Sequence, residues 1–243
     1  AKGDTVLHGN FVSGFSDHTI VPEGGLVPIR KDMPLDWACL MSCAIPTGWG
    51  SVNKLAGVTL GDKVAVWGLG GIGQNVLRAA KMRQANPLIA VDLEESRRGI
   101  AEELGATHFI CNSKEDPVPI IKEVTDGGVD FAFEASGDPG AIEQAVWTLG
   151  MAGNMVVVGI MAQDQVAKVP LTYMVLQQKS IITGLYGSVA VQDDIPKLCD
   201  LAMTKEMKID KIIEGKFKLD QLNDIAEKME QRQIGGRWVC EWD

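Results

Sequence analysis

The stretch KVAVWGLGGIG, residues 63–73, decides the fold. Its first five residues form an apolar run typical of a buried strand, and the six that follow match the pattern G-x-G-x-x-G. Residues 74–82 then place apolar side chains on one face of a helix. A strand, a glycine-rich turn and a helix in this order predict a loop that holds a pyrophosphate against the helix N-terminus.

The glycines of this loop each have a physical role. Gly68 permits the tight turn, Gly70 lets the backbone approach the pyrophosphate, and Gly73 allows the helix to pack closely on the strand. Asp92 follows nineteen residues after Gly73, at the end of the next apolar run. Its carboxylate can accept hydrogen bonds from a ribose 2′-hydroxyl and would repel a 2′-phosphate, so NAD is favoured over NADP. A purely structural turn and an S-adenosylmethionine loop of a methyltransferase are the alternatives.

The same alternation of strand and helix continues along the chain. Strands are predicted at residues 63–67, 87–91, 108–111, 129–135, 154–160 and 180–186. Helices are predicted between them at residues 74–82, 95–104, 119–124 and 141–149. Apolar strands separated by helices of about 10–15 residues are typical of a parallel sheet covered on both faces. We therefore predict an α/β fold with a Rossmann doubly wound parallel sheet.

The segments on either side of this core have other patterns. Residues 11–29 are rich in glycine and β-branched side chains and predict short strands and loops. Residues 34–57 have a helical pattern that we expect to break near Pro46. Beyond the core, helices are predicted at residues 195–203 and 219–229, and GRWVCEW at 236–242 predicts a terminal strand.

Composition excludes several classes of protein. The 243 residues are 46% hydrophobic and 23% charged, which is typical of a globular protein and not of a disordered one. The 23 basic and 32 acidic residues give a net charge of −9, so we expect neither a nucleic-acid partner nor an anionic membrane. The five cysteines are an odd number among apolar neighbours, which favours the cytoplasm over a disulfide framework.

Several stretches together resemble one known family. They include FSDHTIVPEGGLVPI, CLMSCAIPTGWGSV, VAVWGLGGIGQNV, VDLEESR, GGVDFAFEASG, VVVGI and GRWV. In content and order the chain resembles the later two-thirds of the medium-chain, zinc-containing alcohol dehydrogenases, which include the glutathione-dependent formaldehyde dehydrogenases. The resemblance implies a Rossmann domain flanked by remnants of a GroES-like, β-rich catalytic domain. The implied boundaries are 1–44 for the first catalytic part, 45–187 for the NAD-binding domain and 188–243 for the return to the catalytic domain.

The resemblance also implies roles for individual residues. Cys43 corresponds to a ligand of a catalytic zinc ion, and Thr47 to a residue beside the nicotinamide. The implied cofactor contacts are Thr47, the loop residues Gly68, Gly70, Gly71, Ile72 and Gly73, Asp92 and Arg97 at the adenosine, Val158, Gly159, Ile160, Leu185 and Tyr186 at the nicotinamide, and Arg237 at the pyrophosphate.

The zinc site is incomplete in this sequence. The family's other cysteine ligand, its Gly-His-Glu motif and its proton relay lie upstream, and the start AKGD suggests that upstream residues exist. Most zinc ligands are therefore expected outside this segment, although a metal pair of Cys39 and Cys43 is the alternative. The remaining candidates are predicted to be structural or at the surface: His8, His18, His108, Cys111, Cys199, Cys240 and Glu134.

The sequence thus predicts an NAD-dependent oxidoreductase that interconverts an alcohol and an aldehyde or ketone by zinc-assisted hydride transfer. The alternative is a non-catalytic or truncated NAD-binding module, and we expect residues 1–243 alone to bind NAD without turnover. The family also implies a homodimer or homotetramer, in which a short strand near Gln165–Val169 pairs with its twin.

Overall fold

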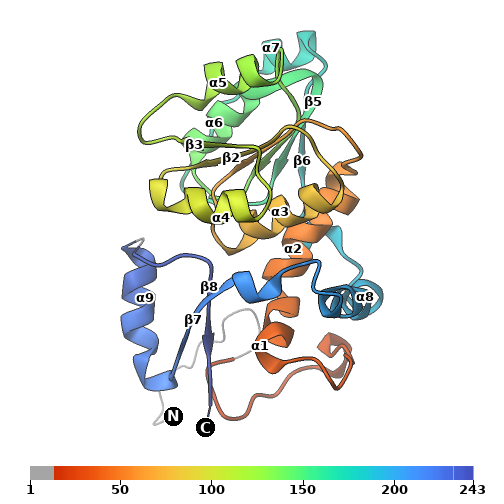
Figure 1. Ribbon diagram of the computed structural model, residues 1–243, viewed down its shortest axis with the longest axis vertical. Helices are drawn as coiled ribbons and strands as arrows, with labels where there is room; N and C mark the ends of the chain where they lie inside the picture. Colours follow the sequence, from red (N-terminus) through yellow and green to blue (C-terminus); the bar gives the residue numbers. More distant parts are fainter. Residues whose placement is uncertain (1–13, 232, 243) are drawn as a thin grey trace.

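A parallel six-stranded sheet forms one half of the computed structural model, which describes residues 14–231 and 233–242 (Figure 1). Its strands are β1 (Val64–Trp67), β2 (Leu88–Asp92), β3 (His108–Cys111), β4 (Val129–Glu134), β5 (Leu149–Val157) and β6 (Ser180–Thr183). Their order is β3-β2-β1-β4-β5-β6, and every neighbouring pair is parallel. This order confirms the predicted doubly wound Rossmann sheet.

Helices cover both faces of the sheet. They are α3 (Gly71–Met82), α4 (Arg98–Glu103), α5 (Pro117–Val124), α6 (Pro139–Thr148) and α7 (Leu171–Leu176). Alternate residues of β1 enter different cores: Val64 and Val66 pack with α3 and α4, while Ala65 and Trp67 pack with α5 and α6. All four side chains of β1 are buried, which explains why the strand has no polar positions in the sequence.

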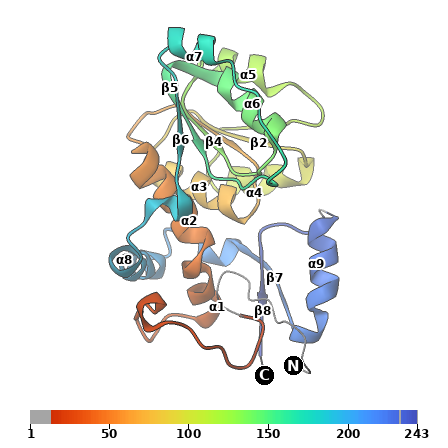
Figure 2. The same ribbon diagram turned by 180° about the vertical axis from the view of Figure 1, so that it is seen from behind.

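The two ends of the described chain meet in the other half of the molecule (Figures 1 and 2). This half contains the helices α1 (Leu35–Ala38), α2 (Ala44–Gly50), α8 (Val191–Met203) and α9 (Leu222–Glu230). It also contains the parallel strands β7 (Ile213–Phe217) and β8 (Arg237–Cys240). A third core unites early residues such as Leu40 and Ile45 with Leu198 of α8. Among the described residues, every helix is too short or too polar to cross a membrane.

The helical region around Pro46 differs from its prediction. The break falls at Cys43, whose φ of −155° and ψ of −74° interrupt the helix, and Pro46 lies inside α2. Proline is tolerated in the first turn because its missing N–H has no partner there in any helix. After Gly50 the chain continues as one wider helical segment, Ser51–Ala56, and stops at Gly57 with a φ of +68°.

Two other predictions about local structure were wrong. The described part of the early segment, residues 14–29, holds no strand and only the short turn Glu23–Gly25. β5 and β6 end at Val157 and Thr183, three residues before their predicted ends. Residues 165–169 form no strand within this chain, where the Lys168 backbone N–H donates to the Glu143 side chain; pairing of this segment with its twin in a second copy stays a prediction. The predicted terminal strand is confirmed as β8, whereas its partner β7 was not predicted.

Candidate functional site

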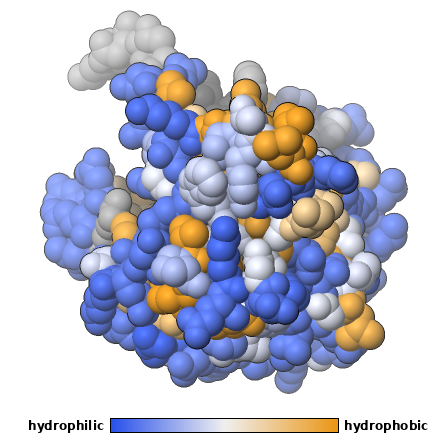
Figure 3. All heavy atoms as spheres, turned by 90° about the horizontal axis from the view of Figure 1, so that it is seen from above, coloured by the Kyte–Doolittle hydropathy of each residue, from blue (hydrophilic) through white to orange (hydrophobic). Residues whose placement is uncertain are grey.

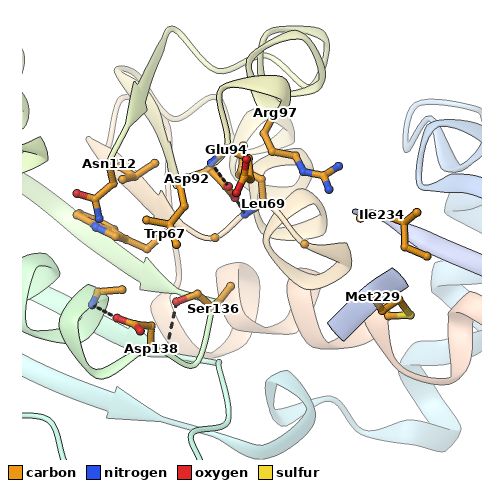
Figure 4. Close-up of a pocket in the computed structure, with 17 residues that line it drawn as sticks. Trp67, Leu69, Asp92, Glu94, Arg97, Asn112, Ser136, Asp138, Met229 and Ile234 are labelled. Carbon is orange, nitrogen blue, oxygen red and sulfur yellow. Dashed lines mark hydrogen bonds between the residues drawn. The ribbon is translucent and has the colours of Figure 1, made fainter. Parts of the chain in front are cut away.

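A pocket of about 580 Å³ opens at the carboxyl ends of β1, β2 and β4 (Figure 4). It lies at the point where the strand order reverses between β1 and β4, which is where open α/β sheets bind their ligands. Its walls come from the loop after β1 and from the ends of β2, β3 and β4. Met229, Ile234 and Gly235 close it from the other half of the molecule.

The glycine loop forms the floor of this pocket and packs as predicted. Gly68 has a φ of +83°, and its N–H donates to the Val91 carbonyl at 2.9 Å, which fixes the turn to β2. A Cβ atom at Gly73 would clash with the Gly68 carbonyl oxygen, so only glycine lets α3 approach this closely. At Gly70 the space that a side chain would occupy is open. The helix α3 then begins at Gly71, and its first N–H groups are free to bind an anion.

Asp92 lies at the end of β2 with its carboxylate toward the glycine loop (Figure 4). Its Oδ2 accepts from the Leu69 N–H at 2.6 Å, and its Oδ1 accepts from the Glu94 N–H at 2.9 Å. The side chain of Glu94 lines the same part of the pocket. Asp92 therefore holds the loop in place, and a second carboxylate adds to the negative charge beside it.

Arg237 reaches the same loop from β8. A Cβ atom added at Gly71 would lie 2.5 Å from the Arg237 Cζ, so the guanidinium covers the first residue of α3. Burial lowers the pKa of Arg237, which is a sign that its charge is partly removed from water. A positive side chain is thus held against the positive end of a helix, an arrangement that an anion between them would stabilise.

Arg97 lines the pocket but is already paired. Its Nη1 lies 2.9 Å from Oε1 of Glu214 in β7, and its guanidinium packs against the backbone of Gly235. Both side chains of this ion pair are more than two-thirds shielded from solvent. Arg97 therefore connects the sheet to the β7–β8 half at the rim of the pocket.

Cys43, Thr47 and Tyr186 gather at the start of α2. The Cys43 thiol is exposed. The Tyr186 hydroxyl donates to the Ser42 carbonyl at 2.6 Å, and burial raises the pKa of this tyrosine. Thr47 is buried one turn along the helix, and its backbone N–H donates to the Cys43 carbonyl oxygen at 3.0 Å.

The other predicted nicotinamide residues follow the ends of β5 and β6. The N–H groups of Val158 and Gly159 both donate to the Glu134 carbonyl, at 2.8 and 2.9 Å. Ile160 and Leu185 are each 86% exposed. Of the predicted cofactor residues, Gly68, Gly70, Asp92 and Arg97 line the 580 Å³ pocket. The others lie outside its walls: Thr47, Gly71, Ile72, Gly73, Val158, Gly159, Ile160, Leu185, Tyr186 and Arg237.

The described residues do not form a complete zinc site. They contain no group of three or more His, Cys, Asp or Glu side chains able to hold a metal ion. A catalytic zinc ion needs about three protein ligands, and Cys43 could supply one. Cys39 donates its thiol hydrogen to the Asp36 carbonyl, which gives no support to a Cys39–Cys43 pair.

The remaining polar candidates have structural positions. Cys111 and Cys199 are buried and Cys240 is half-buried, whereas His18 and His108 are exposed; His8 lies outside the described residues. Glu134 is fully buried, and its Oε1 accepts hydrogen bonds from the N–H groups of Ser136 and Gly137. It therefore shapes the turn after β4, as its predicted structural role requires.

Sequence reasoning missed several residues of the pocket wall, namely Trp67, Asn112, Ser136, Asp138, Met229 and Ile234. The position of Asn112 after β3, and of Ser136 and Asp138 after β4, could have indicated them, because ligands bind at carboxyl ends of parallel strands. Met229 and Ile234 had no such signal, since they reach the pocket only through tertiary packing.

Comparison with known proteins gives one consistent family. Residues 71–204 match the family model described as zinc-binding dehydrogenase. The chain is 34% identical to geraniol dehydrogenase of Carpoglyphus lactis, over 88% of this chain and 57% of that protein. It is 35% identical to alcohol dehydrogenase-like 5 of Arabidopsis thaliana, over 94% of this chain and 60% of that protein.

A solved structure agrees with these relatives. Benzyl alcohol dehydrogenase from Acinetobacter calcoaceticus superimposes with a TM-score of 0.84 at 34% identity, covering 89% of this chain and 59% of that one. The chain therefore spans less than two-thirds of the length of the relatives that it matches.

Proposed function

The chain belongs to the medium-chain, zinc-binding alcohol dehydrogenase family, and from that membership we propose that it carries the NAD-binding part of an enzyme that interconverts an alcohol and an aldehyde or ketone. The boundaries of that part are proposed at residues 45–187, with 1–44 and 188–243 belonging to the catalytic domain. The substrate is a small molecule. Which alcohol it is depends on the pocket of the whole protein.

One observation carries the proposal: Arg237 covers the first residue of α3, directly above the glycine loop. A dinucleotide pyrophosphate between them would receive the free N–H groups of the helix from one side and a guanidinium from the other. Asp92 stands where the adenosine ribose of that dinucleotide would lie. NAD, when bound, exchanges a hydride at its nicotinamide ring, and this chain supplies the binding and orientation.

The chain's own residues can position the reacting end of the cofactor. Thr47 on α2 and the backbone after β5 and β6 are proposed to face the nicotinamide, with Tyr186 anchored to Ser42 at the edge of that region. Cys43 is proposed as a zinc ligand of the complete site. The described residues hold no group of three or more possible metal ligands, so the remaining zinc ligands are proposed to come from the rest of the whole protein.

A variant tests the proposal. Arg237→Gln removes the guanidinium above the loop, and we expect NAD to bind about 10- to 100-fold more weakly, as for the loss of a charge-assisted hydrogen bond. Arg30→Gln is the matched control, because Arg30 pairs with Asp32 and Asp200 at the surface. Titration of the purified protein with NAD measures the affinity. Formation of NADH from a panel of alcohols measures the oxidoreductase activity. Equal NAD affinity in both variants would contradict the proposed site.

A non-catalytic NAD-binding module is the second candidate function. It is favoured by the single candidate zinc ligand among the described residues. In that case the unmodified protein would bind NAD and the Arg237→Gln variant would bind it more weakly. Neither protein would form NADH from any alcohol of the panel.

We further propose that the protein forms a homodimer or homotetramer through the outer edge of the sheet. β6 is the last strand and has no partner on its far side within the described chain. Figure 3 views the end of the molecule where α5 and α7 lie, and apolar patches interrupt the hydrophilic surface there. The exposed apolar side chains near this edge are Val166, Leu171, Val175 and Leu176. A monomer in sedimentation experiments would contradict the proposal.

The cytoplasm is the proposed location. All five cysteines are free thiols, and Cys39 and Cys43 are exposed, which suits a reducing compartment. Localisation of a fluorescent fusion in the source cell would test this.

A further inference from the structure

Arg97 is the only cation on the described walls of the 580 Å³ pocket, which also carry the carboxylates of Asp92, Glu94 and Asp138. It lies in the short turn between β2 and α4, close behind Asp92 in the chain. A 2′-phosphate on a ribose beside Asp92 would need a positive partner, and a nearby arginine is the usual one. The pairing of Arg97 therefore bears on which cofactor the pocket accepts.

The Arg97 guanidinium lies at the rim of the pocket. Its side chain is 18% exposed, and a Cβ atom added at Gly235, another wall residue, would clash with its Nη2. In Figure 4 the side chain extends toward the side of the pocket where Ile234 lies. Within the described residues its hydrogen bonding comes from Nη1 alone. Nε and Nη2 are not among the fully buried atoms that lack a partner, so a ligand or solvent can reach them.

Glu214 of β7 holds the remaining nitrogen of that guanidinium. Its Oε1 lies 2.9 Å from Arg97 Nη1, and its Oε2 accepts a hydrogen bond from the Gly235 N–H at 3.1 Å. The Glu214 side chain is 29% exposed, so the ion pair is largely removed from water. Two contacts thus fix the carboxylate in place, and its negative charge offsets that of Arg97 for any anion nearby.

The ion pair changes the electrostatic balance of the wall. Once Glu214 offsets Arg97, the carboxylates of Asp92, Glu94 and Asp138 remain without a cation on the described wall. A ribose 2′-hydroxyl can donate to such a carboxylate, whereas a phosphate monoester brings up to about two negative charges at neutral pH. To use Arg97, a 2′-phosphate would have to displace Glu214 or bind beside it.

We propose that Glu214 is a positioning residue that sets the cofactor preference through Arg97: it keeps the wall's cation in an ion pair, where a 2′-phosphate cannot use its charge. The inference rests on the proposed function, because it presupposes that the pocket takes a nicotinamide dinucleotide. It adds to Asp92 a second determinant, which comes from β7 in the other half of the molecule (Figure 1).

The test compares the binding of NAD and NADP to the unmodified protein and to Glu214→Gln by calorimetric titration. Glutamine keeps the size of the side chain and an oxygen for the Gly235 N–H, but it leaves the charge of Arg97 without a partner. We expect NADP to bind about tenfold more tightly to the variant, as for a gained charge-assisted hydrogen bond, while NAD affinity changes less than about twofold. If Glu214→Gln fails to fold, Glu214→Ser replaces it and should show the same shift.

Two smaller ligands locate the effect. Adenosine 2′,5′-bisphosphate carries the 2′-phosphate without the nicotinamide, and adenosine 5′-monophosphate lacks both. The first should gain affinity in Glu214→Gln by the same factor as NADP, and the second should not. An equal change for both would place the effect away from the 2′ position and overturn the inference.

Two further variants show whether the effect passes through Arg97. Glu103→Gln is the matched control, because Glu103 of α4 also pairs with the other half of the molecule, through Lys211 at 3.1 Å, but lies outside the pocket walls. Its cofactor preference should equal that of the unmodified protein. In an Arg97→Gln background, Glu214→Gln should no longer tighten NADP binding. A merely structural role of Glu214 would instead weaken both cofactors alike.

The outcomes distinguish this inference from the proposed function. If the protein binds NAD but Glu214→Gln leaves NADP affinity unchanged, or raises it equally in the Arg97→Gln background, the inference is wrong and the proposed function stands. Tighter binding of NADP than of NAD by the unmodified protein would also overturn the inference, because Arg97 would then be available despite Glu214. Binding of neither dinucleotide would contradict the proposed function and the inference together.

Discussion

Asp92 and Glu94 stand at the same rim of the pocket, but they make different contacts. The Asp92 carboxylate accepts hydrogen bonds from the backbone N–H groups of Leu69 and Glu94, whereas Glu94 itself lines the pocket. A 2′-phosphate in this place would meet two negative charges. At the scale of single residues, this pair is the reason to expect NAD in preference to NADP.

Substitutions at these two positions should separate their contributions. Asp92→Gly should weaken NAD binding and narrow the preference for NAD by roughly 1–3 kcal/mol, because it removes both the ribose acceptor and the Leu69 contact. Glu94→Gln keeps the backbone contacts, so NAD affinity should stay the same while NADP binds more tightly. Titration of both cofactors against tryptophan fluorescence measures this. Tighter binding of NADP than of NAD by the unmodified protein would refute the interpretation.

At the scale of elements, a partly buried ion pair connects α8 to the helical segment that follows α2. Lys54 Nζ lies 2.5 Å from Asp194 Oδ2, and the same oxygen accepts the Ala190 N–H at 2.7 Å. Burial raises the pKa of Asp194, but the Lys54 and Ala190 hydrogen bonds and nearby lysine charges outweigh it and hold the pKa below the ordinary 3.8. Ionised Asp194 is thus favoured in the folded protein.

Loss of this pair should be visible in stability. Asp194→Asn should lower the free energy of unfolding by about 1–2 kcal/mol at neutral pH, since Lys54 is one-third exposed and partly solvated. Because the folded pKa is depressed, the contribution is present above pH 3.8 and is lost as the pH falls through the lower folded value.

Urea unfolding at neutral pH and below pH 3.8 would measure the difference. Asp193→Asn, an exposed neighbour in the same turn of α8, is the control and should change little. A constant difference between Asp194→Asn and the unmodified protein at both pH values would contradict the assignment.

The elements that could be predicted from the sequence are those whose local pattern agrees with their burial. β1 through β4 are mostly apolar and mostly buried, and tertiary packing leaves their bounds nearly as predicted. β7 was not predicted, because its alternating pattern covers only five residues and Gly215 stands at one of its three inward positions, which leaves two apolar side chains as the signal. The break at Cys43 was also hidden, since no glycine or proline marks it and the proline nearby belongs inside α2.

At the scale of the whole molecule, the candidate site was predicted only where its residues are local in sequence. The glycine loop and Asp92 come from one strand–helix–strand unit, and the structure brings them together. Met229 and Ile234 were missed, because only the fold brings them across the molecule to the pocket. Arg237, which contacts Gly71 and not the pocket wall, was assigned to the site through family resemblance.

We expect residues 1–243, expressed alone, to bind NAD without oxidising alcohols. The loop, Asp92 and Arg237 all lie within this segment, whereas its described residues offer no cluster of metal ligands. Zinc content, NAD titration and oxidation of ethanol or a formaldehyde adduct would be measured on the same preparation. Stoichiometric zinc with turnover would show that residues assigned here to structure are ligands.

The position of Arg237 over the start of α3 also sets an order of events during biosynthesis. A ribosome releases the glycine loop and the whole six-stranded sheet before it adds β8, so the sheet can assemble while the guanidinium that completes the site is still unmade. If the protein takes NAD as proposed, the nascent polypeptide would at first bind it without this guanidinium and therefore more weakly. The full stabilising effect of the proposed cofactor would be reached only after translation has passed residue 237, which would make tight cofactor binding a late event in the maturation of this protein.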